Sequence, residues 1–292
     1  MDIQRERDHP GTNVLVSLVN GLPQTTISLN DRAVTYGDGL FETIALIDGV
    51  PHHWTRHLRR LATGCARLYI DYPPSEIWTH DLANAISFSS LPSRAVLKLL
   101  LSRGEGRRGY APDSDHVPQR IVQLSRWPIA VTGNLASFVA GECSMRVGSN
   151  PTLAGIKHLN RLEQVLGARE IAIANVNEGV MFDLAERAIA GVRSNLFIVR
   201  DGRIRTPALA GAGVAGIMRE VVLEEALHCG LNIEEGAIER AELAAADELF
   251  FTNSLWGIQP ATAYVACGRV RTLITTIGVR LRDHFQQRGL MP

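Results

Sequence analysis

The chain has 292 residues, of which 46% are hydrophobic and 21% charged, as in a globular protein with one large core or two smaller ones. Thirty basic residues balance thirty acidic ones, which argues against nucleic acid or an anionic membrane as the main partner. Apolar runs such as 95–101 are too short to span a bilayer. Residues 1–12 lack the apolar core of a signal peptide and are expected to form a flexible tail.

The four cysteines are Cys65, Cys143, Cys229 and Cys267, and they show no CxxC spacing. We therefore expect buried free thiols in a reducing, cytoplasmic compartment, and no metal site.

The first part of the chain predicts strands and a helix that together form a small N-terminal α/β domain over 13–125. A strand and turn are expected over 14–23, followed by a hairpin over 39–54 that turns at Asp48-Gly49. Residues 55–70 place Leu58, Leu61 and Cys65 at helical spacing. Two further strands follow, over 93–104 and 119–127. The Trp-Pro and Gly of 126–134 indicate a linker.

The second part, 135–292, predicts a larger C-terminal domain. Strands are expected near 135–147, and a helix follows Lys157 with one apolar face formed by Leu159, Leu162, Val165, Leu166 and Ile173. Two strands turning at Asp201-Gly202, a Gly-rich turn leading into a helix that ends at Gly230, a strand–loop–strand unit over 247–264 and a final helix complete the chain. The mixture predicts an α+β fold with mainly antiparallel sheets.

Lysine is the rarest charged residue of this chain, because 28 of the 30 basic residues are Arg and only Lys98 and Lys157 are Lys. An arginine stays protonated at useful pH and forms no imine, whereas a lysine amine does so once desolvation or nearby positive charge lowers its pKa. Lys157 is therefore a candidate nucleophile. Chance retention in an Arg-rich composition is the alternative, and Lys98 lies in a strand with no sign of chemistry.

Four further segments are candidate anion sites, each with a structural alternative. The Gly-rich stretch 211–220 offers backbone N–H groups at a helix N-terminus, or is only a flexible loop, and its spacing excludes a P-loop. Within 56–61, Arg56 and Arg60 share one helical face, which either binds a phosphate or is simply exposed to solvent. The hydroxyls of 252–254 bind an anion or cap a turn, and the loop 102–110 closes over an acidic substrate or is merely flexible.

A reactive lysine combined with an anion cradle from separate elements is what pyridoxal phosphate requires of a protein. The chain resembles the fold-type IV pyridoxal-phosphate enzymes, which include branched-chain and D-amino-acid aminotransferases, and it is most similar to their aminodeoxychorismate lyase branch. The segments that carry the resemblance span most of the chain in order: "DRAVTYGDGLFETI" (31–44), "HLRRL" (57–61), "SRGEGRRGY" (102–110), "NPTLAGIKHLNRLEQVL" (150–166), "SNLFIVRDGRIRTP" (194–207), "GVAGIMR" (213–219) and "NSLWGIQP" (253–260). The stretch after the lysine is typical of the lyase branch.

The resemblance implies roles for individual residues. Lys157 matches the lysine that binds the cofactor covalently and moves protons, and Arg60 matches the phosphate-binding arginine. The backbone amides of Ile217 and Met218 and the hydroxyl of Ser254 match the rest of the phosphate cradle. The remaining matches lie near the substrate. Thr43 matches a catalytic position, and the substrate-binding positions are matched by Tyr36, Arg108, Arg161 and Leu255. The resemblance also implies two domains with the cofactor between them, and a homodimer.

One position departs from the family pattern. The family usually has a Glu five residues before the Asn of "NLF", in contact with the pyridine nitrogen of the cofactor, and this chain has Ala190 there. A carboxylate keeps that nitrogen protonated, and alanine does not. The nearby Glu186 is expected in a hairpin turn, where it does not replace the missing carboxylate.

The resemblance implies lyase activity, in which pyruvate is eliminated from 4-amino-4-deoxychorismate to give 4-aminobenzoate for folate biosynthesis, at a rate weakened by Ala190. The alternative on the same fold is transamination of a D-amino or branched-chain amino acid. A protein that binds pyridoxal phosphate with little catalysis is the alternative from another class.

Overall fold

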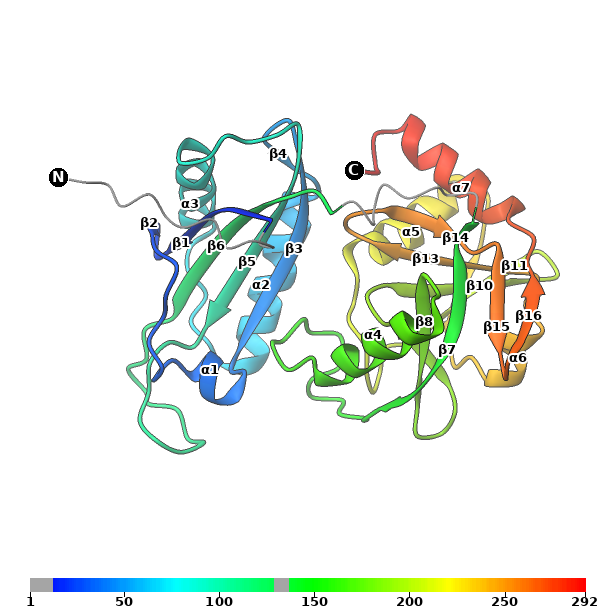
Figure 1. The fold of residues 1–292 in the computed structure, drawn as a ribbon, viewed down its shortest axis with the longest axis horizontal. Coiled ribbons are helices and arrows are strands. Elements are labelled where there is room, and N and C mark those ends of the chain that lie inside the picture. The colour runs from blue at the N-terminus through cyan, green and yellow to red at the C-terminus, as the bar shows by residue number, and fades with distance from the viewer. Residues whose placement is uncertain (1–12, 129–136) are drawn as a thin grey trace.

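The computed structural model describes residues 13–128 and 137–292, which form three β-sheets and seven helices within those ranges. One sheet belongs to residues 14–126, and the two others belong to residues 139–272 (Figure 1). Most strand pairs are antiparallel, as predicted, and three are parallel: β11 with β12, β15 with β7, and β7 with β8. The fold is therefore α+β. No helix in the described part of the chain is long and apolar enough to cross a membrane.

The N-terminal sheet has six strands in the order β2-β1-β6-β5-β3-β4. Their bounds are Val14–Val19 (β1), Leu22–Pro23 (β2), Gly39–Ile47 (β3), Val50–Pro51 (β4), Arg94–Ser102 (β5) and Gln119–Arg126 (β6). The predicted hairpin is β3–β4, and both turn residues have positive φ, 49° at Asp48 and 80° at Gly49. Such a turn follows the right-handed twist of the two strands.

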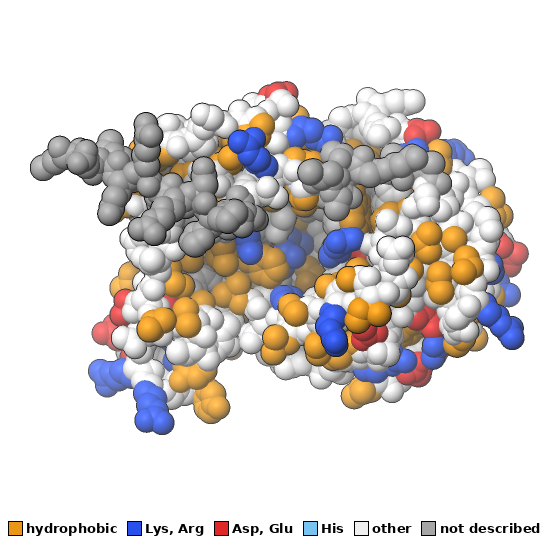
Figure 2. All heavy atoms as spheres, in the orientation of Figure 1, with side chains coloured by type: hydrophobic (Ala, Val, Ile, Leu, Met, Phe, Trp, Pro, Cys, Tyr) orange, Lys and Arg blue, Asp and Glu red, His pale blue; other side chains and the backbone are white. Residues whose placement is uncertain are grey.

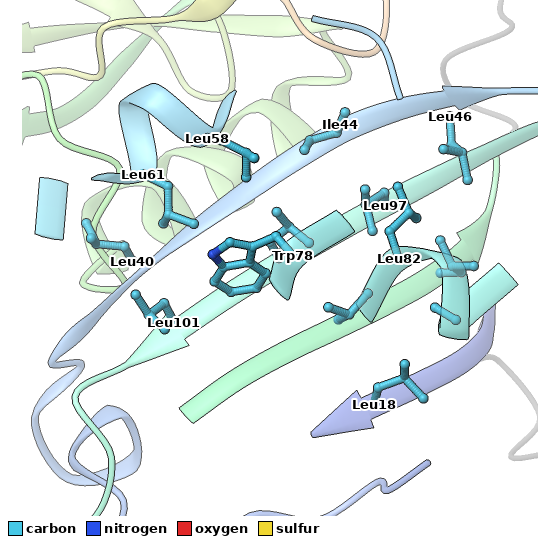
Figure 3. Close-up of a cluster of buried hydrophobic side chains, with 14 of the residues drawn as sticks. Leu18, Leu40, Ile44, Leu46, Leu58, Leu61, Trp78, Leu82, Leu97 and Leu101 are labelled. Atoms are coloured by element: carbon cyan, nitrogen blue, oxygen red, sulfur yellow. The ribbon is translucent and has the colours of Figure 1, made fainter. Parts of the chain in front are cut away.

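One face of this sheet is covered by helices. The helices of this half are α1 (Arg32–Tyr36), α2 (Trp54–Leu68) and α3 (Ser75–Ser87), and the sequence pattern did not predict α1 or α3. Leu58 and Leu61 of α2 and Trp78 of α3 pack against core-facing strand residues such as Ile44 and Leu97 (Figure 3). Residues 40, 42, 44 and 46 of β3 face this core, so Phe41 and Thr43 face the opposite side.

The C-terminal half packs two five-stranded sheets face to face. One has the order β16-β15-β7-β8-β9, and the other has the order β12-β11-β10-β13-β14. The strands of the first are Val139–Val147 (β7), Glu178–Asp183 (β8), Ala188–Gly191 (β9), Ala263–Ala266 (β15) and Arg269–Thr272 (β16). Those of the second are Asn195–Arg200 (β10), Arg203–Pro207 (β11), Ile233–Gly236 (β12), Glu248–Asn253 (β13) and Gly257–Pro260 (β14).

Four helices belong to this half: α4 (Leu162–Ala174), α5 (Ile217–His228), α6 (Arg240–Ala244) and α7 (Thr276–Gln287). Alternation along β10 and β13 sends Leu196 and Phe251 into the core between the sheets, and sends Phe197 and Phe250 toward α5 and α7. On the other side, Ile171 of α4 packs with Met181 of β8. The C-terminal half therefore has four layers: helices α5 and α7, two sheets, and helix α4.

The predicted apolar face of α4 points outward in this chain. Leu162 is 77% exposed and Ile173 is 72% exposed, and Val165 and Leu166 are exposed as well. The buried residues of α4 are Gly167 and Ile171, because the backbone of the helix lies close to β8 and a Cβ at Gly167 would already meet Val192 at 3.0 Å. The prediction of four buried free thiols is partly wrong. All four thiols are free, but only Cys65 and Cys143 are buried.

The predicted tail 1–12 lies outside the described residues, as do residues 129–134 of the predicted linker 126–134. Arg126 itself ends strand β6. The domain limits 13–125 and 135–292 stay a prediction.

Candidate active site

A cavity of about 370 Å³ is lined by residues from both halves of the chain. β3 and α2 contribute Phe41, Thr43 and Arg60, and the second half contributes Lys157, Arg161 and residues of β8, β9, β10 and β13 and of the Gly-rich loop 213–216. On the face drawn in Figure 2, the molecule is hollowed between the two halves, with basic and hydrophobic side chains around the hollow.

The segment that carries Lys157 is hydrogen-bonded on both sides. The backbone N–H of Phe41 donates to the carbonyl of Lys157 at 3.0 Å, and that of Leu159 donates to Gly39 at 2.9 Å. Toward the Gly-rich loop, Gly155 donates to Gly213 at 3.0 Å and accepts from Ala215 at 3.0 Å. Lys157 is therefore held between β3 and the loop that precedes α5, so its position is fixed from both halves.

The Lys157 amine lies in an environment that disfavours its charge. Burial, followed by the neighbouring positive charge of Arg60, lowers the pKa of Lys157 from 10.5 to about 7. Its Nζ lies 4.2 Å from the ring centroid of Phe41, a contact that favours the charged form only weakly. A large fraction of Lys157 is thus neutral and nucleophilic near pH 7.

Arg60 is held by a buried acid that the sequence pattern did not single out. Its Nε donates to Glu42 at 2.8 Å, its Nη2 donates to the same carboxylate, and its Nη1 donates to the carbonyl of Ala215 at 2.7 Å. His57 lies on the other side of Glu42, with Nδ1 at 2.6 Å. Burial opposes the charge of Glu42, but Arg60 and His57 outweigh it and lower the pKa of Glu42 to about 2.

The Gly-rich loop ends in a helix N-terminus that borders the cavity. Gly216 is the N-cap of α5 and provides no side-chain cap, which leaves backbone N–H groups of the first turn available to an anion. A Cβ at Gly216 would lie 1.9 Å from the Oδ1 of Asn195, whose Nδ2 donates to Val214 at 2.8 Å. Only glycine fits at this position, which accounts for part of the Gly-rich signal.

The structure brings most of the predicted site residues together. Those that line the cavity are Thr43, Arg60, Lys157, Arg161, Ala190, Ile217, Ser254 and Leu255. The side chain of Met218 is buried in the core beneath α5, which leaves only its backbone near the cavity. Tyr36 and Arg108 do not line the cavity of a single chain: the Tyr36 hydroxyl accepts from the Gly109 N–H at 3.0 Å, and Arg108 is exposed.

The cavity wall holds no acid. The described lining residues include Arg60, Lys157, Arg161 and Arg193 but no Asp or Glu, and Ala190 lies in that wall, opposite Met181 on β8. Glu178 is fully buried behind β9 and accepts from the N–H groups of Gly179 and Val192 and from the hydroxyl of Ser194. Glu186 has φ 61° in the β8–β9 turn, as the sequence predicted, and the structure pairs it with Arg146.

Sequence reasoning missed three residues of the site, Phe41, Glu42 and Gln164, whereas Thr252 belongs to the predicted hydroxyl segment 252–254. Glu42 carried a signal, because an acid between Leu40 and Ile44 on the inward face of a strand is buried and needs a cationic partner. Thr252 is fully buried with an unpartnered hydroxyl, and the Oε1 of Gln164 is buried without a partner, and both residues line the cavity. Unpartnered polar atoms in a cavity wall indicate a polar ligand.

An aldehyde cofactor with a phosphate requires four features that this cavity has. They are a partly buried lysine with a lowered pKa, an arginine held by a buried acid, a helix N-terminus with free N–H groups, and unpartnered polar atoms. The fold and site therefore define a pyridoxal-phosphate enzyme of fold type IV. The family model described as "Amino-transferase class IV" matches residues 39–264. The chain belongs to this family, whose cofactor is pyridoxal phosphate.

Among its relatives, the aminodeoxychorismate lyase of Vibrio harveyi is 36% identical over 249 residues, which cover 85% of this chain and 91% of the relative. A putative branched-chain-amino-acid aminotransferase of Methanocaldococcus jannaschii is 29% identical, covering 89% of this chain and 90% of the relative. Among solved structures, the 4-amino-4-deoxychorismate lyase of Pseudomonas aeruginosa has a TM-score of 0.83 and 39% identity, covering 93% of this chain and 98% of that one.

Proposed function

We propose that the chain is a pyridoxal-phosphate-dependent lyase that converts 4-amino-4-deoxychorismate into 4-aminobenzoate and pyruvate. The observation that carries the proposal is a partly buried lysine, with a pKa lowered to about 7, in a cavity whose described ionisable residues are all Arg or Lys. That charge suits a phosphate on the cofactor and a substrate with two carboxylates. Similarity to the lyases of V. harveyi and P. aeruginosa supports the same reaction class.

Each residue of the site then has a role. Lys157 would hold the cofactor through its aldehyde, and its amine would take the proton from the amine-bearing ring carbon of the substrate. The cofactor supplies an electron-withdrawing ring. Arg60, the first-turn amides of α5 and Ser254 hold the phosphate. Arg161 has Nε and Nη2 fixed on the carbonyls of His158 and Ile156, at 2.9 and 2.8 Å, which leaves Nη1 for a substrate carboxylate.

The overall chemistry balances without a further reactant. The bond between the ring carbon and the ether oxygen breaks, and the side chain leaves as the enol of pyruvate and takes up a proton. The proton removed by Lys157 leaves the ring, which becomes aromatic. Because aromatisation favours this step, the reaction tolerates Ala190, whereas transamination depends more strongly on a protonated cofactor ring.

We infer that the active form is a homodimer in the cytoplasm, with domains over 13–125 and 135–292 and the cofactor between them. The exposed apolar face of α4 supports the dimer, because Leu162, Val165 and Ile173 form a patch on a helix that begins beside Lys157. Tyr36 and Arg108 lie away from the cavity of their own chain, so we place them near the cavity of a second copy. The free cysteines favour a reducing compartment.

The test is to incubate the purified protein, loaded with pyridoxal phosphate, with 4-amino-4-deoxychorismate and to follow 4-aminobenzoate and pyruvate. We expect the two products in equal amounts, and none from Lys157→Ala. Borohydride reduction followed by peptide mapping should label Lys157. Labelling of Lys98, the only other lysine, would reject the assignment.

The same preparation separates the alternatives. Turnover of a D-amino or branched-chain amino acid with 2-oxoglutarate, without products from aminodeoxychorismate, identifies an aminotransferase. A yellow protein whose absorbance responds to no amine substrate identifies a binding protein with little catalysis.

A further inference from the structure

Both lysines of this chain lie over the same aromatic ring. The Nζ of Lys157 is 4.2 Å from the ring centroid of Phe41, and the Nζ of Lys98 is 5.6 Å from it. The two nitrogens are therefore no more than about 10 Å apart, by the sum of these distances. The sequence offered no reason for a lysine at position 98, and this contact provides one.

Lys98 approaches from the N-terminal sheet. It lies on β5 directly opposite Thr43 of β3, so its side chain is on the same face as Phe41 and Thr43, which both line the cavity. Its side chain is partly exposed to solvent. Within residues 13–128 and 137–292 no carboxylate pairs with it. Its positive charge therefore acts on the cavity without a counter-ion.

We propose that Lys98 is a positioning residue for the chemistry of Lys157: its charge, held beside the Phe41 ring, keeps the Lys157 amine in the neutral form that attacks the cofactor aldehyde. The role rests on the proposed function, since it matters only if Lys157 reacts as an amine. Like-charge repulsion of this kind is a known way to activate a buried lysine.

The other positively charged side chains around Lys157 are held by ion pairs or by hydrogen bonds to carbonyl groups. Arg60 on α2 is paired with Glu42 on β3, whose negative charge raises the pKa of Lys157 and offsets the arginine. Arg161 precedes α4 and also lowers that pKa, as does Lys98. Arg193 lies at the rim, where it is about half exposed and donates to the carbonyl of Asn177. Lys98 and Arg161 are thus the two described cations near Lys157 that no acid pairs with, and Lys98 is the one that approaches from the N-terminal sheet.

The experiment uses the small number of lysines. Protein labelled isotopically at the lysine ε carbon gives only two lysine signals by NMR, and Lys157→Met identifies which belongs to Lys157. The pH titration of the Lys157 signal, in the absence of cofactor, reports its pKa directly. The variants are Lys98→Met, which removes the charge, Lys98→Arg, which keeps it, and Lys98→Gln as a second neutral replacement in case Lys98→Met does not fold.

We expect the neutral variants to raise the pKa of Lys157 by about 1, as a unit charge at this distance does at an effective dielectric constant near 20. The neutral fraction of Lys157 below its pKa then falls roughly tenfold, and Lys98→Arg leaves the titration close to that of the wild type. An unchanged pKa in Lys98→Met or Lys98→Gln overturns the proposal, as does an equal change in Lys98→Arg. Because the titration needs neither cofactor nor substrate, a failed lyase assay leaves this result unaffected.

Discussion

Replacement of Lys157 by methionine should stabilise the cofactor-free protein at neutral pH. Lys157 is partly buried in the cavity wall, and this burial together with Arg60 lowers its pKa from 10.5 to about 7. The unfolded chain therefore holds the lysine proton up to pH 10.5, whereas the folded chain releases it near pH 7. At about 1.36 kcal/mol for each pKa unit, this difference costs the folded state about 5 kcal/mol below pH 7. Methionine has a similar length and carries no charge.

The sign of the pH dependence follows from the lowered pKa. The cost is complete below the folded-state pKa, decreases as the pH rises, and disappears above the unfolded-state value, so wild-type stability rises through this window. Urea unfolding of the wild type and Lys157→Met near pH 6 and near pH 10 measures the gap, expected to be a few kcal/mol at the lower pH and close to zero at the higher. Lys98→Arg is the matched control and should show no such change. A gap that is the same at both pH values would refute the reasoning.

Three other substitutions test the site. Glu42→Gln leaves Arg60 and His57 without their buried acid, so unfolding experiments should show a loss of about 3 kcal/mol or more, and spectroscopic titration should show weaker binding of pyridoxal phosphate. Gly216→Ala places a Cβ 1.9 Å from the Asn195 Oδ1, so titration with pyridoxal phosphate should show at least a roughly tenfold loss of affinity, about 1.4 kcal/mol, with a smaller loss of stability. Ala190→Glu introduces an acid into the cavity wall and should raise the ratio of aminotransferase to lyase turnover roughly tenfold, about 1.4 kcal/mol in relative barrier. An unchanged ratio would show that residue 190 does not determine which reaction the enzyme catalyses.

Local turn chemistry made parts of this fold predictable. Asp48-Gly49 and Asp201-Gly202 both turn hairpins with positive φ at each residue, as such pairs do whatever the rest of the fold. The α4 helix shows the limit of the same approach. Its 3.6-residue period identified which residues share a face, but the choice of the inward face depended on how closely α4 approaches β8. Gly167 permits that approach, and the apolar residues are left on the outside.

The residues of the site also divide into those that the sequence singled out and those that only the structure revealed. The sequence singled out Lys157 because imine chemistry excludes arginine and the chain contains only two lysines, and the structure has Lys157 in the cavity wall. Glu42 and Phe41 were not predicted as site residues, because their roles depend on the register of β3 against the Lys157 segment. For Thr252 the sequence left two alternatives, anion binding or turn capping, and the structure favours a ligand because the hydroxyl is buried without a partner in the cavity wall.

Two unusual features of the cavity, a lysine with a pKa lowered to about 7 and an alanine at position 190, share one electrostatic contribution, because no described residue of the cavity wall is an acid. The acids of this region lie one layer behind the wall, with Glu42 behind Arg60 and Glu178 behind β9, so the wall itself presents cations. Burial first, and then the cations of this wall, lower the pKa of Lys157, and the described wall residues provide no acid to keep a cofactor ring nitrogen protonated. The two properties should therefore change together. Ala190→Glu is expected to raise the pKa of Lys157 as well as to favour transamination, and a change in reaction choice with an unchanged lysine titration would show that the two are independent.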